Sequence, residues 1–166
     1  MNEGIIQIYY GEGHGKSTAA IGNAIRYASE GKSVIIIQFL KGKNENELAF
    51  LNRLEPEIKI FRFAKSDESF EELSEQEQQE EAMNLRNGFN YGKKVVTTDA
   101  CDMLILDEVL GVIDEKVVTP QEMQELFENK PDDMTLICTG RVLEDSIRPY
   151  ADEIYNIAPE KIRIDE

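Results

Sequence analysis

The sequence predicts an α/β fold, a three-layer sandwich in which helices cover a mostly parallel central sheet. Segments of strand and helix character alternate along all 166 residues, and most of the strand-like segments are continuous apolar runs. Continuous runs of strand length are typical of parallel strands that are buried on both faces. Their alternation with helices indicates βαβ units joined by right-handed crossovers. We therefore expect residues 1–166 to form one domain.

Six short apolar runs are the expected strands, at residues 5–9, 33–39, 58–63, 103–106, 135–138 and 154–157. Helices are expected between them, at residues 15–29, 45–54, 68–94, 120–128 and 143–150. The first helix has its apolar residues at helical spacing. The fourth has a clear start, because Thr119 can cap it and Pro120 suits a first turn. The turn residues at 129–133 end that helix before the fifth strand.

A glycine-rich loop follows the first expected strand and ends in Lys16-Ser17. It reads Gly-Glu-Gly-His-Gly-Lys-Ser-Thr over residues 11–18, a pattern by which proteins hold a nucleoside triphosphate. Glycines let backbone N–H groups turn toward phosphate oxygens, Lys16 supplies a mobile cation, and Ser17 offers a hydroxyl to Mg²⁺. The expected phosphate-binding residues are Gly11, Glu12, Gly13, His14, Gly15, Lys16, Ser17 and Thr18. The sequence therefore predicts a P-loop NTPase-like, RecA-like version of the fold.

The loop departs from the general P-loop consensus at its beginning. The consensus would place glycine at position 10, where this chain has Tyr10. A shortened or shifted loop argues against the commonest ATPases and GTPases and favours a subfamily that holds the triphosphate in its own way. Within the loop, we expect His14 to contribute its backbone N–H rather than to act as a catalytic group.

Two carboxylates follow the fourth expected strand, in Met-Leu-Ile-Leu-Asp107-Glu108. In a P-loop protein a central strand brings acid to the metal at its carboxyl end. Alone the pattern is weak, since strands often end in acidic turns. Because it follows the loop in the expected chain order, it predicts a metal site formed by Ser17, Asp107 and Glu108.

Two cations also follow expected strands. Lys41 comes after the second strand and Arg141 after the fifth, so both belong to the edge of the sheet that carries the loop. They are candidate ligands of phosphate or ribose, and the alternative, ordinary surface cations at strand ends, stays open.

The charge and composition exclude several classes of function. A net charge of −15 and a pI of about 4.5 disfavour a nucleic-acid motor or helicase, because an acidic body repels the phosphate backbone. Much of the charge lies at residues 68–81, where the alternatives are a solvated helix face and an acidic interaction patch. No apolar run approaches the ~20 residues of a membrane span, and the first residues do not resemble a signal peptide.

Cysteine and histidine usage limits the chemistry further. Cys101 and Cys138 lie far apart without metal-type spacing, so we expect reduced core residues of a cytoplasmic protein. His14 is the single histidine, which rules out a multi-histidine metal site. A Ser-His-Asp set and a reactive cysteine context are also missing, so in an enzyme the attacking atom would come from a second substrate. The alternatives are a P-loop kinase or phosphohydrolase acting on a small metabolite and a non-catalytic ATP-binding regulatory module.

Four segments together carry a family resemblance: the loop with Tyr10 before it and Thr-Ala-Ala after it, Gln38-Phe39-x-Lys41-Gly42, Leu106-Asp107-Glu108, and Thr139-Gly140-Arg141. In this order they resemble the ATP:corrinoid adenosyltransferases of the P-loop type. The loop of that family typically reads Gly-x-Gly-x-Gly-Lys-Thr-Thr-Ala-Ala, which accounts for the absent glycine at position 10. The resemblance runs from about residue 5 to residue 158.

The resemblance implies transfer of the 5′-deoxyadenosyl group of ATP to Co(I) of a corrinoid, with release of triphosphate. It implies ATP and corrinoid as substrates, Mg²⁺ as the metal, and ATP lying reversed relative to most P-loop proteins. Lys16 and the loop amides would stabilise the leaving triphosphate, Ser17 and Glu108 would hold Mg²⁺, and Lys16 and Glu108 would be the catalytic residues. Phe70 would lie near the corrinoid and help to displace the lower axial ligand of cobalt. A flavoprotein reductant and a homodimer are further expectations.

Overall fold

The computed structural model describes residues 3–40, 50–66 and 68–164. Their six strands form one sheet in the order β3-β2-β4-β5-β1-β6, and every neighbouring pair is parallel. The strands are β1 Ile6–Tyr10, β2 Val34–Gln38, β3 Ile58–Arg62, β4 Met103–Asp107, β5 Thr135–Gly140 and β6 Glu153–Asn156. The α-helices are α1 Lys16–Ser29, α3 Glu75–Thr97, α4 Val109–Asp114 and α5 Pro120–Asn129, and the 3-10 helices are η1 Asn52–Leu54, η2 Phe70–Glu72 and η3 Asp145–Tyr150.

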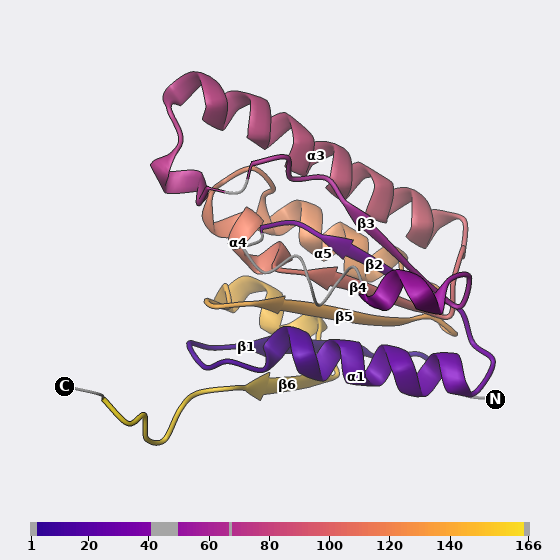
Figure 1. Cartoon of the computed structure of the whole chain (residues 1–166). Coiled ribbons are helices and arrows are strands. Elements are labelled where there is room, and N and C mark those ends of the chain that lie inside the picture. Colours follow the sequence, from indigo (N-terminus) through magenta and orange to yellow (C-terminus); the bar gives the residue numbers. More distant parts are fainter. Residues whose placement is uncertain (1–2, 41–49, 67, 165–166) are drawn as a thin grey trace.

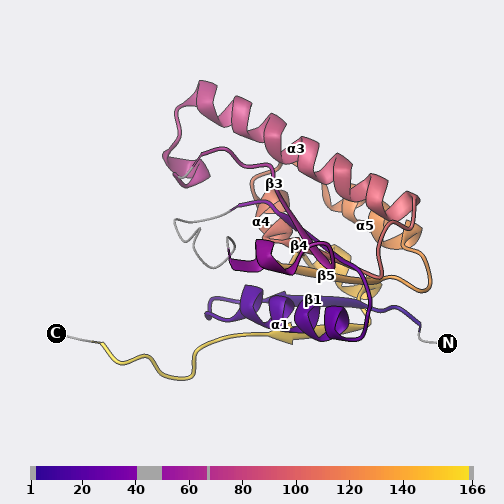
Figure 2. The same cartoon turned by 45° about the vertical axis from the view of Figure 1, so that its right-hand side comes forward.

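Helices cover both faces of the sheet, as Figures 1 and 2 show. α1 lies on one face, and α3, α4 and α5 lie on the other. The glycine-rich loop between β1 and α1 and the beginning of α3 lie at the same, carboxyl, edge of the sheet, on the left in Figure 1. The three-layer sandwich predicted by the sequence is therefore confirmed, with a sheet that is parallel throughout its described pairs.

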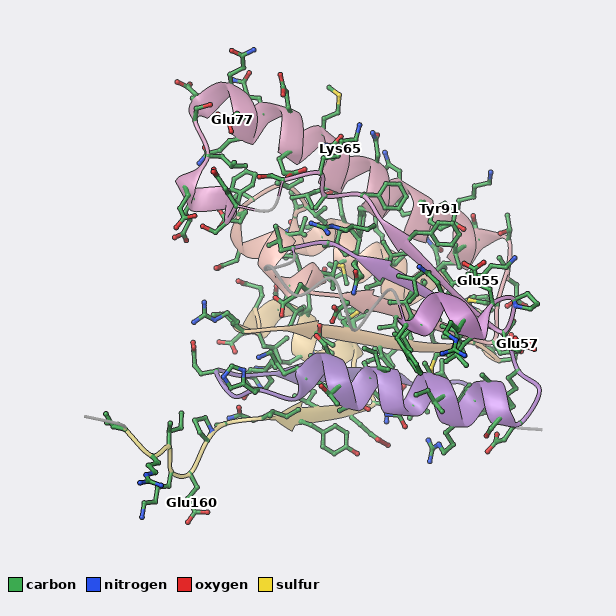
Figure 3. All side chains as sticks on the ribbon, viewed as in Figure 1. Glu55, Glu57, Lys65, Glu77, Tyr91 and Glu160 are labelled. Atoms are coloured by element: carbon green, nitrogen blue, oxygen red, sulfur yellow. The ribbon has the colours of Figure 1, made fainter. Side chains whose placement is uncertain are left out.

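α3 packs closely on its face of the sheet because two of its residues are glycines. A Cβ on Gly88 would lie 3.1 Å from the ring of Phe63, and Gly92 faces Ile37 and Leu106. The ring of Tyr91 lies 4.9 Å from that of Phe61, and Figure 3 shows Tyr91 between α3 and the sheet. These contacts fix the helix firmly to the sheet.

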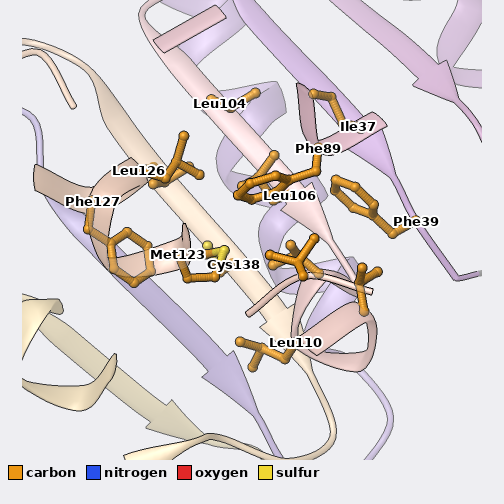
Figure 4. Close-up of a cluster of buried hydrophobic side chains, with 14 of the residues drawn as sticks. Ile37, Phe39, Phe89, Leu104, Leu106, Leu110, Met123, Leu126, Phe127 and Cys138 are labelled. Atoms are coloured by element: carbon orange, nitrogen blue, oxygen red, sulfur yellow. The ribbon is translucent and has the colours of Figure 1, made fainter. Parts of the chain in front are cut away.

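Successive residues of each buried strand enter two separate cores, one on each face. Leu104 and Leu106 of β4 pack under α3, α4 and α5, whereas Met103 and Ile105 pack under α1. Figure 4 shows the first core, in which Phe89 of α3 and Met123, Leu126 and Phe127 of α5 meet side chains of the sheet. This arrangement explains why the strands read as continuous apolar runs.

The predicted strands are confirmed to within two residues at each end, although two helix predictions are wrong. The helix expected from residue 68 begins at Glu75, because the Ser74 side chain accepts a hydrogen bond from the backbone N–H of Glu77 and caps it. Residues 143–150 contain the 3-10 helix η3, with Pro149 inside it, rather than an α-helix. α4 was not predicted, since it is a short apolar segment directly after an apolar strand. Of the helix expected at 45–54, residues 45–49 lie outside the described residues, and 50–54 are helical.

The expectation that both cysteines are unpaired core residues is confirmed. Cys101 and Cys138 are free and buried, and burial raises the pKa of the Cys101 thiol to about 12. None of the helices among the described residues combines the length and apolar character needed to cross a membrane.

Candidate active site

The glycine-rich loop begins where β1 ends and leads directly into α1. Gly11 has a φ of 126° and Gly15, the residue before the helix, has a φ of 108°. A Cβ on Gly11 would lie 2.4 Å from the carbonyl oxygen of Ile157, and one on Gly13 would lie 2.8 Å from the same oxygen. The backbone N–H of Gly13 donates a 2.9 Å hydrogen bond to that carbonyl. The chain after β6 therefore lies against the loop so closely that only glycine fits.

Tyr10 is an ordinary strand residue, which explains why glycine is not needed there. It is the last residue of β1, pairs with Gly140 and Asn156, and its carbonyl accepts the N–H of Ile157 at 2.7 Å. Its ring lies 5.3 Å from the guanidinium carbon of Arg148. The turn of the loop starts one residue later than in the general consensus.

Lys16 lies inside the curve of the loop. Its side chain is 9% exposed, and its Nζ donates to the carbonyl oxygens of Gly11 at 2.7 Å and Gly13 at 2.8 Å. The ammonium group is thus already held against the backbone of the loop. A phosphate in the loop would offer it a charged acceptor in place of two neutral ones, and such charge-assisted bonds are the stronger kind.

Ser17, Asp107 and Thr139 form one hydrogen-bond network across three elements. The hydroxyls of Ser17 and Thr139 both donate to Oδ1 of Asp107, at 2.7 and 2.8 Å. The backbone N–H of Glu108 in turn donates to Oγ1 of Thr139 at 2.8 Å. Asp107 is 5% exposed and Thr139 is fully buried, so this network joins α1, β4 and β5 beneath the site. Thr139 belongs to the predicted Thr-Gly-Arg segment, but its role in fixing Asp107 was not predicted.

The oxygen atoms of Ser17, Asp107 and Glu108 suit a magnesium ion. Mg²⁺ prefers hard oxygen ligands, and it usually takes one or two from carboxylates and the rest from water and phosphate. Among the described residues, no group of three or more His, Cys, Asp or Glu side chains could hold a metal on its own. The hydroxyl of Ser17 and the carboxylates of Asp107 and Glu108 are oxygen donors of the kind that Mg²⁺ prefers. Glu108 has left-handed backbone angles, with a φ of 63°, and starts α4 at the edge of the site.

A cavity of 760 Å³ joins this network to the segment that follows β3. Its wall includes Ser17, Asp107, Glu108, Phe70 and Arg141. Much of the remaining wall is acidic and consists of Glu68, Glu71, Glu72, Glu81, Asp114 and Glu115. Burial, together with nearby Glu71 and Asp114, raises the pKa of Glu115. The structure thus brings Phe70, which is distant in sequence, to the same cavity as the predicted metal ligands.

Four further residues of the predicted site are exposed, namely Glu12, His14, Thr18 and Arg141. Arg141 and Glu12 form an ion pair of 2.8 Å, with side chains 68% and 65% exposed. His14 and Thr18 are exposed, in the loop and in the first turn of α1. Lys41 lies outside the described residues.

Glu81 belongs to the acidic residues 68–81, for which the sequence suggested a solvated helix face or an interaction patch, but its side chain is buried. It is 6% exposed, whereas the six other glutamates of residues 68–81 are exposed. The signal that reveals it is helical spacing, because Glu81 precedes buried Leu85 and Phe89 on the same face of α3.

Comparison with known proteins gives both a family and a fold. The family described as ATP:corrinoid adenosyltransferase BtuR/CobO/CobP matches residues 2–166. The chain is 29% identical over 162 residues to the corrinoid adenosyltransferase of Escherichia coli (strain K12), covering 98% of this chain and 80% of that protein. It is 30% identical over 162 residues to corrinoid adenosyltransferase CobA of Salmonella typhimurium (strain LT2), with the same two coverages.

Two solved structures resemble the fold alone. The KaiC-like protein PH0186 from Pyrococcus horikoshii OT3 aligns with a TM-score of 0.65 at 18% identity, over 99% of this chain and 76% of that one. The flagellar accessory protein FlaH from Methanocaldococcus jannaschii aligns with a TM-score of 0.62 at 17% identity, over 94% and 72%. Both agree with the predicted P-loop NTPase-like sandwich. Because the family match spans nearly all of the chain, the protein belongs to the ATP:corrinoid adenosyltransferases.

Proposed function

We propose that the cavity beside the glycine-rich loop transfers the 5′-deoxyadenosyl group of ATP to the cobalt of a corrinoid. The observation that carries the assignment of residues is the joint lining of this cavity by Ser17, Asp107, Glu108 and Phe70. It supports a phosphate and metal site that shares one cavity of 760 Å³ with an aromatic side chain.

The loop is the proposed binding site of the triphosphate. The ammonium group of Lys16 and the backbone N–H groups of the loop would donate to its oxygens, apart from those of Gly11 and Gly13, which donate to backbone carbonyls. ATP would lie reversed, so that C5′ faces the cavity. These donors are most useful as the C5′–O bond breaks, because negative charge then builds up on the leaving triphosphate. Lys16 is a catalytic residue in this sense.

Ser17 and Glu108 are the proposed ligands of Mg²⁺, with Asp107 beside them. Mg²⁺ bound there would neutralise charge on the triphosphate. The hydrogen bonds of Asp107 to Ser17 and Thr139 support this assignment, because they keep the carboxylate and the hydroxyl together at the edge of β4.

The chemical step needs no side-chain nucleophile and no general base. Co(I) of the corrinoid supplies the electron pair that forms the Co–C5′ bond, cobalt becomes Co(III), and the electron pair of the C5′–O bond leaves with triphosphate. The protein contributes positioning and leaving-group stabilisation. Phe70 would contact the corrinoid and favour loss of its lower axial ligand, which makes Co(II) easier to reduce.

The finer features of the assembly are also proposals. Two buried free thiols suit a reducing compartment, so we place the chain in the cytoplasm. By the family resemblance, a reduced flavoprotein is the proposed electron donor and a homodimer the proposed state. Light scattering on a sizing column tests the dimer, and electron transfer from a reduced flavoprotein to bound Co(II) corrinoid tests the donor.

The decisive experiment is anaerobic incubation of the protein with ATP, Mg²⁺ and chemically reduced Co(I)alamin. We expect a light-sensitive alkylcobalamin and triphosphate in equal amounts, and neither product with Lys16→Ala. Formation of ADP and phosphate would instead indicate a kinase or phosphohydrolase. Bound but uncleaved ATP would indicate a regulatory module.

A further inference from the structure

The segment that carries Phe70 is hydrogen-bonded to α3 at its first residues. The carboxylate of Glu81 accepts the backbone N–H of Lys65 on Oε1 at 2.8 Å and that of Ser66 on Oε2 at 2.7 Å. Asn84, one turn along the helix, donates to Oε1 at 3.1 Å. Figure 3 shows Lys65 beside α3. A buried carboxylate thus uses both of its oxygens to hold the chain after β3.

The same helix also holds the far end of the segment. The side-chain amide of Gln78 donates a 3.0 Å hydrogen bond to the backbone carbonyl of Phe70 itself. Gln78 and Glu81 are three residues apart, so they share one face of α3. Because α3 packs closely on the sheet through Gly88, its hydrogen bonds tie the segment to a rigid element.

The result of these bonds is a fixed place for Phe70. It starts η2, packs against the core on the α3 face, and lines the cavity that also contains Ser17, Asp107 and Glu108. Glu81 binds the backbone at the start of the segment, and Gln78 binds it at Phe70. The described hydrogen bonds of these two side chains do not include the proposed metal ligands.

We propose that Glu81 and Gln78 are positioning residues that hold Phe70 in the wall of the cavity. This inference rests on the proposed function, in which Phe70 contacts the corrinoid. Burying a carboxylate costs free energy, and the hydrogen bonds from two backbone N–H groups offset that cost. An apolar side chain at this position would leave both N–H groups without an acceptor. The hydrogen bonds of the pair are made to Lys65, Ser66, Asn84 and Phe70, so we expect its effect on ATP binding to be small.

Glu81→Gln tests the proposal with little change of shape. A side-chain amide has one oxygen and one NH₂ group, so it cannot accept both N–H groups and must oppose one of them with a donor. Glu80→Gln is the matched control, because Glu80 is the preceding residue, is exposed, and loses the same charge. Gln78→Ala, with exposed Gln79→Ala as its control, provides a second and milder variant in case Glu81→Gln is poorly folded.

The first readout is kinetic and spectroscopic. For Glu81→Gln we expect an unchanged Kd for ATP and a loss of about tenfold in kcat/KM with Co(II) corrinoid and reductant, as for one lost charge-assisted hydrogen bond. The visible spectrum should show that a larger fraction of the bound Co(II) corrinoid retains its lower axial ligand than in wild type. In a Phe70→Ala background, Glu81→Gln should cause no further loss. The proposal would be overturned if Glu80→Gln and Glu81→Gln lost kcat/KM equally. It would also be overturned if Glu81→Gln lowered kcat/KM by the same factor in the Phe70→Ala background as in wild type.

The second readout does not depend on corrinoid chemistry. The chain contains no tryptophan, so Phe70→Trp introduces a single tryptophan at this position, which can be excited selectively over the six tyrosines. Adding Glu81→Gln or Gln78→Ala should shift its emission to longer wavelength and raise its quenching by acrylamide, whereas Glu80→Gln and Gln79→Ala should leave both unchanged. If wild type transfers no adenosyl group while these shifts occur, the proposed function is wrong and the positioning is right. If transfer occurs and the shifts do not, the positioning is wrong.

Discussion

The hydroxyl of Ser17 donates a 2.7 Å hydrogen bond to Oδ1 of Asp107, which joins the glycine-rich loop to the carboxyl end of β4. One proposed magnesium ligand, Ser17, is therefore held by the carboxylate that lies beside the proposed metal site. In that proposal Ser17 and Glu108 would supply two oxygen ligands, and water and the nucleotide would supply the rest. Metal binding would then be linked to ATP binding.

Removal of the Ser17 hydroxyl should weaken the magnesium-dependent part of ATP binding. For Ser17→Ala we expect a loss of about tenfold in affinity for ATP with Mg²⁺, as for one oxygen ligand, and little change without Mg²⁺. Titration calorimetry with and without Mg²⁺ measures both values. Ser29→Ala, at the other end of α1, is the control. Equal losses in the presence and absence of Mg²⁺ would contradict the assignment.

Removal of the Lys16 ammonium group should abolish nucleotide binding without unfolding the protein. Its bonds to Gly11 and Gly13 are internal to the loop. We therefore expect Lys16→Ala to reduce ATP affinity by at least about 100-fold, as for lost charge-assisted bonds to phosphate, and to change Tm little. Equilibrium dialysis and thermal unfolding are the measurements, with exposed Lys93→Ala as control. ATP affinity within a few-fold of wild type would exclude Lys16 from the phosphate site.

Substitution of the loop glycines should destabilise the protein, in contrast to that of a glycine in α1. Gly11→Ala and Gly13→Ala would place Cβ atoms 2.4 and 2.8 Å from the Ile157 carbonyl oxygen. The added atom of Gly22→Ala would meet nothing within 4 Å. In that helix we expect alanine to raise the free energy of unfolding by about 0.5–1 kcal/mol. Urea unfolding compares the three variants, and a stable Gly11→Ala variant would mean that the chain after β6 does not press on the loop.

The ion pair between Arg86 and Glu122 should make part of the stability depend on pH. Hydrogen bonding from Arg86 lowers the pKa of Glu122 to about 2, against 4.5 for an ordinary glutamate. Because the folded pKa is the lower one, the stabilisation is present above pH 4.5 and is lost as the pH falls toward 2.

Glu122→Gln tests this dependence. Both partners are partly exposed, so we discount for screening by solvent and expect a loss of about 1–2 kcal/mol in the free energy of unfolding at pH 7. The difference from wild type should shrink near pH 3. Exposed Glu125→Gln, on the same helix, should have almost no effect at either pH. A difference that stays constant between pH 7 and pH 3 would show that the capping of α5, rather than the charge, is responsible.

The sequence by itself determined the elements whose cause is local. Continuous apolar runs predicted the buried strands, and Thr119 with Pro120 predicted the start of α5. That start is confirmed, and Glu122 completes a capping box with Thr119. The alternation of strands and helices, together with the glycine-rich loop, predicted the fold, and four short segments in their order predicted the family. Such signals depend on residues only a few positions apart, or on the order in which motifs follow one another.

Only the tertiary structure decided which distant residues meet. Gly11 and Gly13 must be glycine because the chain at Ile157 returns to the loop. Phe70 lines the same cavity as Ser17, and its backbone carbonyl accepts a hydrogen bond from Gln78 of α3. Glu81 is buried for the same reason, since its partners are the amides of Lys65 and Ser66. These contacts exist only after the sheet has assembled in its crossed order, which no local pattern encodes.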